Sequence, residues 1–164
     1  MTEAQLLRVA AQLTALAVAL TGSIQSAEDL VQEAITRVYP KLSQIEPAGL
    51  YAYLRATIVN QQRDLVRRRH KAAQYSPPTT TAEPEAFDVG VRIDVRRALS
   101  VLRQDLRLII VLRYLEDRTV ADVAEMLQRP EGTIRRLTHQ ALRELRRTGV
   151  LDDYLINNSN RGSR

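Results

Sequence analysis

Residues 119–147 read TVADVAEMLQRPEGTIRRLTHQALRELRR, and this stretch carries the strongest structural signal in the chain. Thr119 is placed to cap a short helix, which extends to about residue 127 and has apolar residues at helical spacing. A break follows at residues 128–130, and an arginine-rich helix starts at Pro130 or Glu131, since proline suits a first turn. The pattern predicts a helix-turn-helix, in which one helix crosses the DNA backbone and the next enters the major groove.

The second helix of this pair carries the residues that would contact DNA. Thr133, Arg135 and Arg136 lie near its N-terminus, and arginine can bind guanine O6 and N7 in bidentate fashion. Arg143, Arg146 and Arg147 lie further along and are placed to meet phosphates. The predicted buried stripe consists of Ile134, Ala141, Leu142 and Leu145. The alternative interpretation is a solvated basic face on an ordinary helix hairpin.

A second basic cluster ends a longer helix, predicted over residues 50–70. Its buried stripe is predicted to consist of Leu50, Leu54, Ile58 and Leu65. Its C-terminal half contains Arg63, Arg67, Arg68, Arg69 and Lys71, opposed only by Asp64. These cations could bind nucleic acid, but they could also simply favour the helix C-terminus through its dipole.

The remaining pattern is helical as well. Apolar residues recur at three- and four-residue spacing over residues 4–21, and Gly22 is a plausible stop. Ser26 is the predicted N-cap of the next helix, which places Asp29 in its first turn, and Pro40 ends that helix or comes just after its end. Two further helices are predicted around residues 91–102 and 106–116, and no strand-like alternation occurs. The fold class is therefore all-α.

The composition changes over residues 72–90, which hold three prolines, a threonine run and three acids but no Lys or Arg. We interpret this segment as an extended acidic linker between two small helical domains. A long surface loop inside one domain is the alternative, although structureless loops of this length are uncommon in compact domains. The expected domains are residues 1–71 and 91–150, with a tail over residues 151–164.

Composition narrows the function classes. The 164 residues include 24 Lys+Arg, 19 Asp+Glu and no cysteine, which excludes disulfides and cysteine-ligated metals. His70 and His139 are too few and too far apart in sequence for a metal site, and no cofactor is expected. No glycine-rich phosphate loop or nucleophile motif occurs, so we expect neither catalytic residues nor enzyme activity. The weakly polar run over residues 9–22 is judged too short to span a membrane, so we expect a cytoplasmic protein without membrane insertion.

Several of these stretches resemble one known family. Residues 26–33, SAEDLVQE, resemble the "AEDLVQE" signature in region 2 of extracytoplasmic-function (ECF) sigma factors of the sigma-70 family. Residues 52–60, AYLRATIVN, resemble that family's helix that reads the promoter −10 element. Residues 112–135 resemble region 4, which reads the −35 element. The resemblance covers about residues 5–147 and implies a region 2 helical bundle and a region 4 helix-turn-helix, acting in promoter-specific transcription initiation.

The resemblance also implies partners and residue roles. The acidic helix of region 2 docks on the β′ coiled coil of core RNA polymerase, which would place Asp29, Gln32 and Glu33 at that interface. The β subunit and promoter DNA are further implied partners, and an anti-sigma factor is another, because many relatives are held inactive by one. The implied −10 contacts are Tyr51, Tyr53, Arg55, Asn60, Arg63, Arg67 and Arg68, next to a base-capturing loop at residues 45–51. The implied −35 contacts are Thr133, Arg135, Arg136, His139 and Arg143.

The sequence departs from the family pattern at three places. Tyr51 and Tyr53 stand where Trp or Phe is usual, residues 128–130 lack the usual glycine, and Leu137 replaces a basic residue. Two other functions remain as alternatives. One is a sigma-like decoy that binds polymerase or a regulator without melting DNA. The other is a helix-turn-helix repressor, which would need neither the acidic helix nor a second DNA-reading module.

Overall fold

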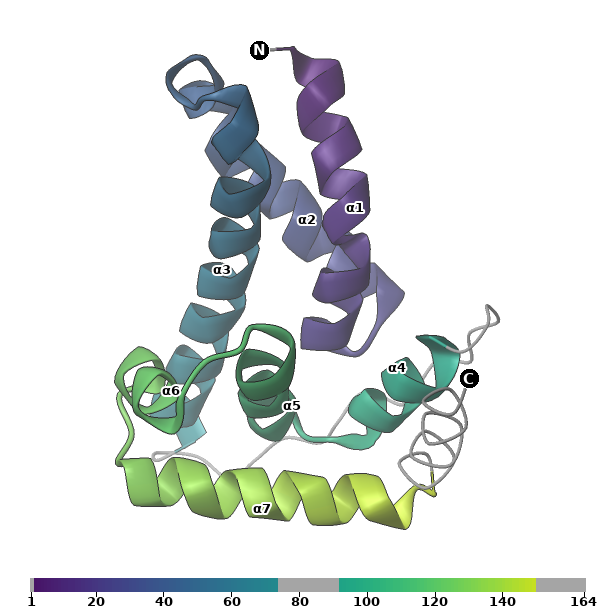
Figure 1. The fold of residues 1–164 in the computed structure, drawn as a ribbon, viewed down its shortest axis with the longest axis vertical. Helices are drawn as coiled ribbons and strands as arrows, with labels where there is room; N and C mark the ends of the chain where they lie inside the picture. The colour runs from purple at the N-terminus through teal and green to yellow at the C-terminus, as the bar shows by residue number, and fades with distance from the viewer. Residues whose placement is uncertain (1, 74–91, 150–164) are drawn as a thin grey trace, which may run out of the picture. The chain divides into compact units, whose positions relative to one another are not determined.

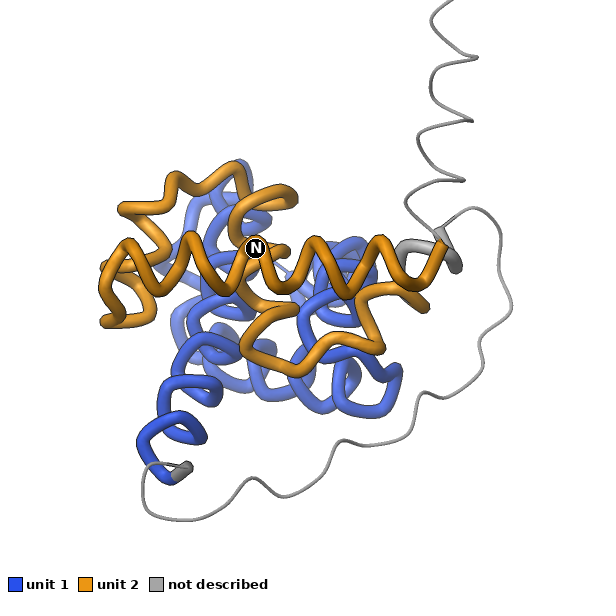
Figure 2. The backbone as a smooth tube through the Cα atoms, turned by 90° about the horizontal axis from the view of Figure 1, so that it is seen from below, with its two compact units in different colours: residues 1–82 blue, residues 83–164 orange. Residues whose placement is uncertain are grey.

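The computed structural model describes residues 2–73 and 92–149, and the chain divides into two compact units, residues 1–82 and 83–164 (Figure 2). The described residues form seven α-helices with short 3-10 and π-helical turns and no strand. The predicted all-α class is therefore confirmed. The predicted linker lies almost wholly in residues 74–91, outside the described residues. The predicted tail, residues 151–164, also lies outside them.

The first unit is a bundle of three helices, α1 (Glu3–Thr21), α2 (Ile24–Val38) and α3 (Leu50–Ala73) (Figure 1). Two short 3-10 helices, η1 (Tyr39–Gln44) and η2 (Pro47–Gly49), connect α2 to α3. The core is aliphatic. Its largest fully buried side chains are Leu6, Leu13, Leu20, Leu50, Leu54 and Ile58.

The turn between α1 and α2 corrects one predicted cap. Gly22 adopts a left-handed conformation (φ 82°) and donates its N–H to the Val18 carbonyl, which confirms it as the stop of α1. The predicted N-cap, Ser26, is wrong, because Ser23 caps α2 and its Oγ accepts from the Ser26 N–H at 3.1 Å. The helix thus begins one turn earlier than predicted, and Asp29 lies in its second turn, where it takes no part in capping.

The buried stripe of α3 also differs from the prediction. Leu50, Leu54 and Ile58 are buried as expected, but Leu65 is half-buried, and the stripe continues through Gln62 and Val66. Gln62 lies four residues after Ile58 and so on the same buried side of the helix. The apolar pattern did not include it because its side chain is polar. Gln62 is accommodated because its Nε2 donates to the Leu20 carbonyl at 3.2 Å, near the end of α1.

The prediction that the weakly polar run over residues 9–22 is too short to span a membrane is also wrong, because the helix that contains most of this run is longer. By length and composition, α1 is able to cross a membrane, with 19 residues and a mean hydropathy of 1.4 over its most apolar window. In the bundle, however, one face of α1 is buried through Leu6, Leu13 and Leu20, and α1 contacts both α2 and α3. A core helix of a bundle requires the same apolar composition, and α1 occupies that place here.

The second unit contains α4 (Arg92–Val101), α5 (Gln104–Ile110), a π-helical turn η3 (Val111–Leu115), α6 (Val120–Leu127) and α7 (Glu131–Arg147). Both α5 and α6 pack on α7 (Figure 1). The core again consists of aliphatic side chains. Its largest fully buried side chains are Leu102, Leu106, Leu108, Ile109, Leu112 and Ile134.

A buried arginine joins α4 to α5. The side chain of Arg107 donates to the carbonyls of Leu99 and Leu102 at 2.7 Å each and to that of Ser100 at 3.0 Å. These carbonyls lie at the end of α4, where helical carbonyls lack partners and the dipole favours a cation. Burial lowers the pKa of Arg107 to about 10, so the guanidinium remains charged at neutral pH.

We expect Arg107→Met to lower the free energy of unfolding by about 2–4 kcal/mol, because three carbonyls lose a charged donor while the methylene stem is largely retained. Urea denaturation followed by circular dichroism measures this change. Arg97→Met is the matched control, since Arg97 is exposed on α4 and its loss should cost about 0.5 kcal/mol or less. Equal losses in the two variants would contradict the role given to Arg107.

Candidate functional site

The start of α6 is set by a reciprocal cap. The Asp122 N–H donates to Thr119 Oγ1 at 3.1 Å, and the Thr119 N–H donates to Asp122 Oδ2 at 2.8 Å. Hydrogen bonding from Thr119, through its side chain first and then its backbone, lowers the pKa of Asp122. The predicted cap at Thr119 is confirmed.

The turn between α6 and α7 forms without a glycine. Gln128 adopts the left-handed conformation (φ 53°, ψ 48°) that glycine usually supplies, and the Arg129 N–H donates to the Ala124 carbonyl at 3.0 Å. Pro130 is the N-cap, so α7 begins at Glu131, the second of the two predicted starts. The Arg129 side chain is only 8% exposed and lies 3.7 Å from the Asp105 carboxylate of α5. This ion pair ties the turn to α5 and helps to hold the start of α7.

One face of α7 is buried, and its composition corrects the prediction. Ile134, Ala141 and Leu145 are buried as predicted, whereas Leu142 is half-buried. Leu137 and Thr138 are also buried, and the Thr138 hydroxyl donates to the Ile134 carbonyl at 2.8 Å. Leu137, which departs from the family pattern, is thus a core residue of this unit.

The opposite face of α7 is basic. Arg135, Arg136, His139 and Arg143 are exposed, and Thr133 is half-buried near the start of the helix. Steps of three and four residues join Arg136, His139 and Arg143 into one continuous line. Arg135 pairs with Glu131 at 2.8 Å, one turn toward the N-terminus. The five predicted −35 residues therefore lie on one helix, with four of them on its exposed side.

The predicted −10 residues are spread over more than one side of α3. Tyr53, Asn60 and Arg67 recur every seven residues, about two turns, so they lie along one side of the helix. Tyr51 and Arg55, one turn apart, lie on another side. Tyr51 and Tyr53 are 42% and 40% exposed, so both rings are accessible for stacking. Arg63 and Arg67 lie 2.9 and 3.8 Å from the Asp64 carboxylate, whereas Arg68 is exposed.

The acidic face predicted for polymerase binding lies on α2. Asp29, Gln32 and Glu33 are exposed and separated by three and four residues, so they share one side of the helix. Glu33 is engaged with Arg37, whose Nη2 lies 2.5 Å from Glu33 Oε1, and both side chains are more than half exposed.

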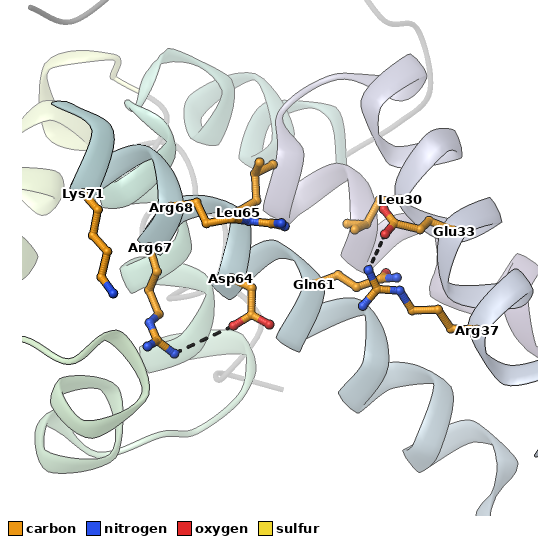
Figure 3. A pocket seen from close by; sticks show the side chains of 9 residues that line it. All are labelled: Leu30, Glu33, Arg37, Gln61, Asp64, Leu65, Arg67, Arg68 and Lys71. Atoms are coloured by element: carbon orange, nitrogen blue, oxygen red, sulfur yellow. Dashed lines mark hydrogen bonds and ion pairs between the residues drawn. The ribbon is translucent and has the colours of Figure 1, made fainter. Parts of the chain in front are cut away.

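A groove of about 460 Å³ lies between α2 and the C-terminal half of α3, beside the acidic face, with which it shares Glu33 (Figure 3). Leu30, Glu33 and Arg37 line it from α2. The lining residues from α3 are Gln61, Asp64, Leu65, Arg67, Arg68 and Lys71. The sequence analysis named the charged residues of this groove except Arg37, but it did not show that α2 and α3 would bring them together. Among the described residues, no group of His, Asp or Glu side chains could hold a metal ion.

Comparisons with known proteins agree with this architecture. Residues 6–72 match the family description "Sigma-70 region 2", and residues 98–147 match "Sigma-70, region 4". An RNA polymerase sigma-E factor from Streptomyces coelicolor is 32% identical over 77% of this chain and 73% of its own length. The chain belongs to the sigma-70 family, in its ECF group. The resemblance inferred from the sequence is confirmed.

Two other sigma-70 relatives are longer than this chain. The ECF RNA polymerase sigma factor SigE of Mycolicibacterium smegmatis is 28% identical over 88% of this chain, which spans 57% of its length. The Xanthomonas campestris relative named probable RNA polymerase sigma factor RfaY is 29% identical over 78% of this chain, which spans 35% of its length. The sigma factor RpoE of Bartonella quintana, solved with the anti-sigma factor NepR, has a TM-score of 0.52 and 26% identity. That match covers 89% of this chain and 94% of that one.

The interaction between Arg129 of the turn and Asp105 of α5 can be measured as a coupling energy. We expect Asp105→Asn and Arg129→Met, made singly and together, to be non-additive by about 1 kcal/mol in the free energy of unfolding from urea denaturation, because Arg129 is buried. Arg103, which also lies 3.6 Å from Asp105 but is 59% exposed, is the matched control. Its coupling to Asp105 should be about 0.3 kcal/mol or less. Equal coupling of both arginines would show that the turn is not held by this pair.

Proposed function

We propose that the chain is an alternative sigma factor, which binds core RNA polymerase and directs it to promoters with matching −10 and −35 elements. The observation that carries this proposal is the pair of exposed basic helix faces, on α3 in region 2 and α7 in region 4, together with the acidic face of α2. Such a specificity subunit contributes no catalysis of its own and acts in the cytoplasm, where the polymerase works. The proposed domains are residues 1–71 and 91–150, joined by residues 72–90.

The proposed DNA contacts follow from the exposed faces. Arg135 and Arg136 would read −35 base edges, while Arg143 would meet phosphates further along α7. Along α3, the Tyr53 ring would stack on an unpaired −10 base, Asn60 would contact the same strand, and the arginines would hold its backbone. The base-capturing loop would be residues 45–51, which contain η2, and Tyr51 would contribute to that contact.

The proposed protein contacts involve α2. Its exposed acids, Asp29 and Glu33, suit a basic partner, and we assign them with Gln32 to the β′ coiled coil of the polymerase. Region 4 would contact the β subunit. The solved Bartonella relative binds an anti-sigma factor, and we propose that a protein of that kind restrains this chain as well.

Run-off transcription with reconstituted holoenzyme separates this function from the alternatives. Initiation from a promoter selected by that holoenzyme supports the sigma factor. Polymerase binding without promoter opening would instead identify a decoy. Binding to a specific operator without polymerase would identify a repressor.

We expect Asp29→Lys to weaken core polymerase binding at least tenfold, because a repulsive charge replaces an attractive one at the centre of the docking face. Titration of core enzyme into fluorescently labelled chain measures the affinity. Glu3→Lys makes the same charge change at an exposed position on α1 and should alter the affinity by less than about twofold. Unchanged affinity in Asp29→Lys would remove Asp29 from the interface.

We expect Arg135→Ala to reduce the preference for a matched over a mutated −35 element by roughly tenfold, since a bidentate base contact contributes about 1–3 kcal/mol of discrimination. Transcription from the two templates measures the preference, and core affinity should remain that of the wild type. A variant that loses activity equally on both templates would show that Arg135 does not read sequence.

A further inference from the structure

Gln61 is a buried amide without a partner. Its side chain is on α3, the residue is only 5% exposed, and neither Oε1 nor Nε2 has a hydrogen-bond partner among the described residues. Burial of an amide without hydrogen bonds is unfavourable, because the desolvated donor and acceptor gain nothing in return. The bundle therefore keeps an unfavourable group at this position.

The neighbouring Gln62 shows that the fold is able to satisfy a buried glutamine. Gln62 is 1% exposed, and its Nε2 donates to the Leu20 carbonyl at 3.2 Å. The two glutamines are adjacent on one helix and equally buried, so they differ in what their amides face. Gln62 faces the end of α1, whereas Gln61 lines the groove between α2 and α3.

The groove borders Gln61, although the two amide atoms are themselves covered in the free chain. In Figure 3 the Gln61 side chain extends from α3 toward Arg37 of α2, which is held by Glu33. That ion pair is exposed and joins residues one turn apart, so exchanging it for another partner costs little. Glu33 also belongs to the proposed docking face, which makes the groove continuous with that face.

The charges of the groove indicate the chemistry of its occupant. Four cations line it, Arg37, Arg67, Arg68 and Lys71, against two acids, Glu33 and Asp64, which gives a net charge of +2. Asp64 is already engaged by Arg63 and Arg67. A carboxylate is the side chain that both a freed Arg37 and the Nε2 donor of Gln61 would bind.

We propose that Gln61 and Arg37 form a pocket for an acidic side chain of core RNA polymerase, in the element that docks on α2. On docking, Arg37 exchanges Glu33 for the incoming carboxylate, and Gln61 Nε2 donates to the same carboxylate. Glu33 is thereby released toward basic groups of the polymerase. This proposal rests on the proposed function, and it assigns a partner to an amide that has none among the described residues.

The experiment compares Gln61→Met with Gln62→Met in the full chain, because methionine matches the length of glutamine without its polar atoms. We expect Gln61→Met to raise the melting temperature, since an unpaired amide is removed, yet to weaken core binding about tenfold. Gln62→Met should lower the melting temperature and change core affinity by less than about twofold. A merely structural role would not move stability and binding in opposite directions.

A second variant tests the acidic occupant. Arg37→Met should leave the melting temperature nearly unchanged, because the Glu33 pair is exposed, but weaken core binding by roughly tenfold. Wild-type core affinity in either Gln61→Met or Arg37→Met would overturn the pocket, as would a lower melting temperature in Gln61→Met. Failure of the proposed function is distinguishable, since a wild-type chain that is a repressor would not bind core enzyme at all, and a decoy would bind it without initiating run-off transcription.

Discussion

The helices α2, α3 and α7 each bury one face and leave the other to solvent, and the proposed interfaces depend on that constraint. The chain has no tryptophan, one phenylalanine and six tyrosines, so both cores are assembled from leucine, isoleucine, valine and alanine. Short aliphatic side chains fill a core only when each helix contributes a continuous stripe. The opposite face of the same helix is then left to solvent. Every proposed interface, on α2, α3 and α7, is such a face.

This constraint explains how much of the fold could be predicted. Apolar spacing alone located the helices in both units, because a stripe that packs must repeat at the helical period. The errors occurred where a polar residue lies in the core. Gln62, Arg107 and Thr138 are buried because each donates to a backbone carbonyl, and hydropathy cannot show which polar side chain will find one. The N-cap was misplaced for a similar reason, since Ser23 and Ser26 are equally suitable by residue type.

The candidate site, like the fold, could be predicted from the sequence only in part. The exposed positions of Arg136, His139 and Arg143 follow from the period of α7. The proposed DNA contacts of Arg136 and Arg143 follow from the helix-turn-helix pattern, whereas that of His139 comes from the family resemblance. The contacts between elements could not be derived from the sequence. Asp105 and Arg129 are 24 positions apart, and only the packing of α5 against the turn brings them together. The groove at Gln61 likewise requires two helices, so no local pattern could indicate it.

The ion pairs on these faces are better understood as exchangeable contacts than as sources of stability. Glu33–Arg37 on α2 and Glu131–Arg135 on α7 are both exposed pairs one turn apart, which contribute a few tenths of a kcal/mol each. In both pairs, at least one member belongs to a proposed interface. A partner carboxylate or a DNA base edge can therefore replace the internal acid at little cost. The buried Arg129–Asp105 pair, by contrast, loses much more if either member is removed. Partner binding should thus rearrange the exposed pairs while the turn that positions α7 stays fixed.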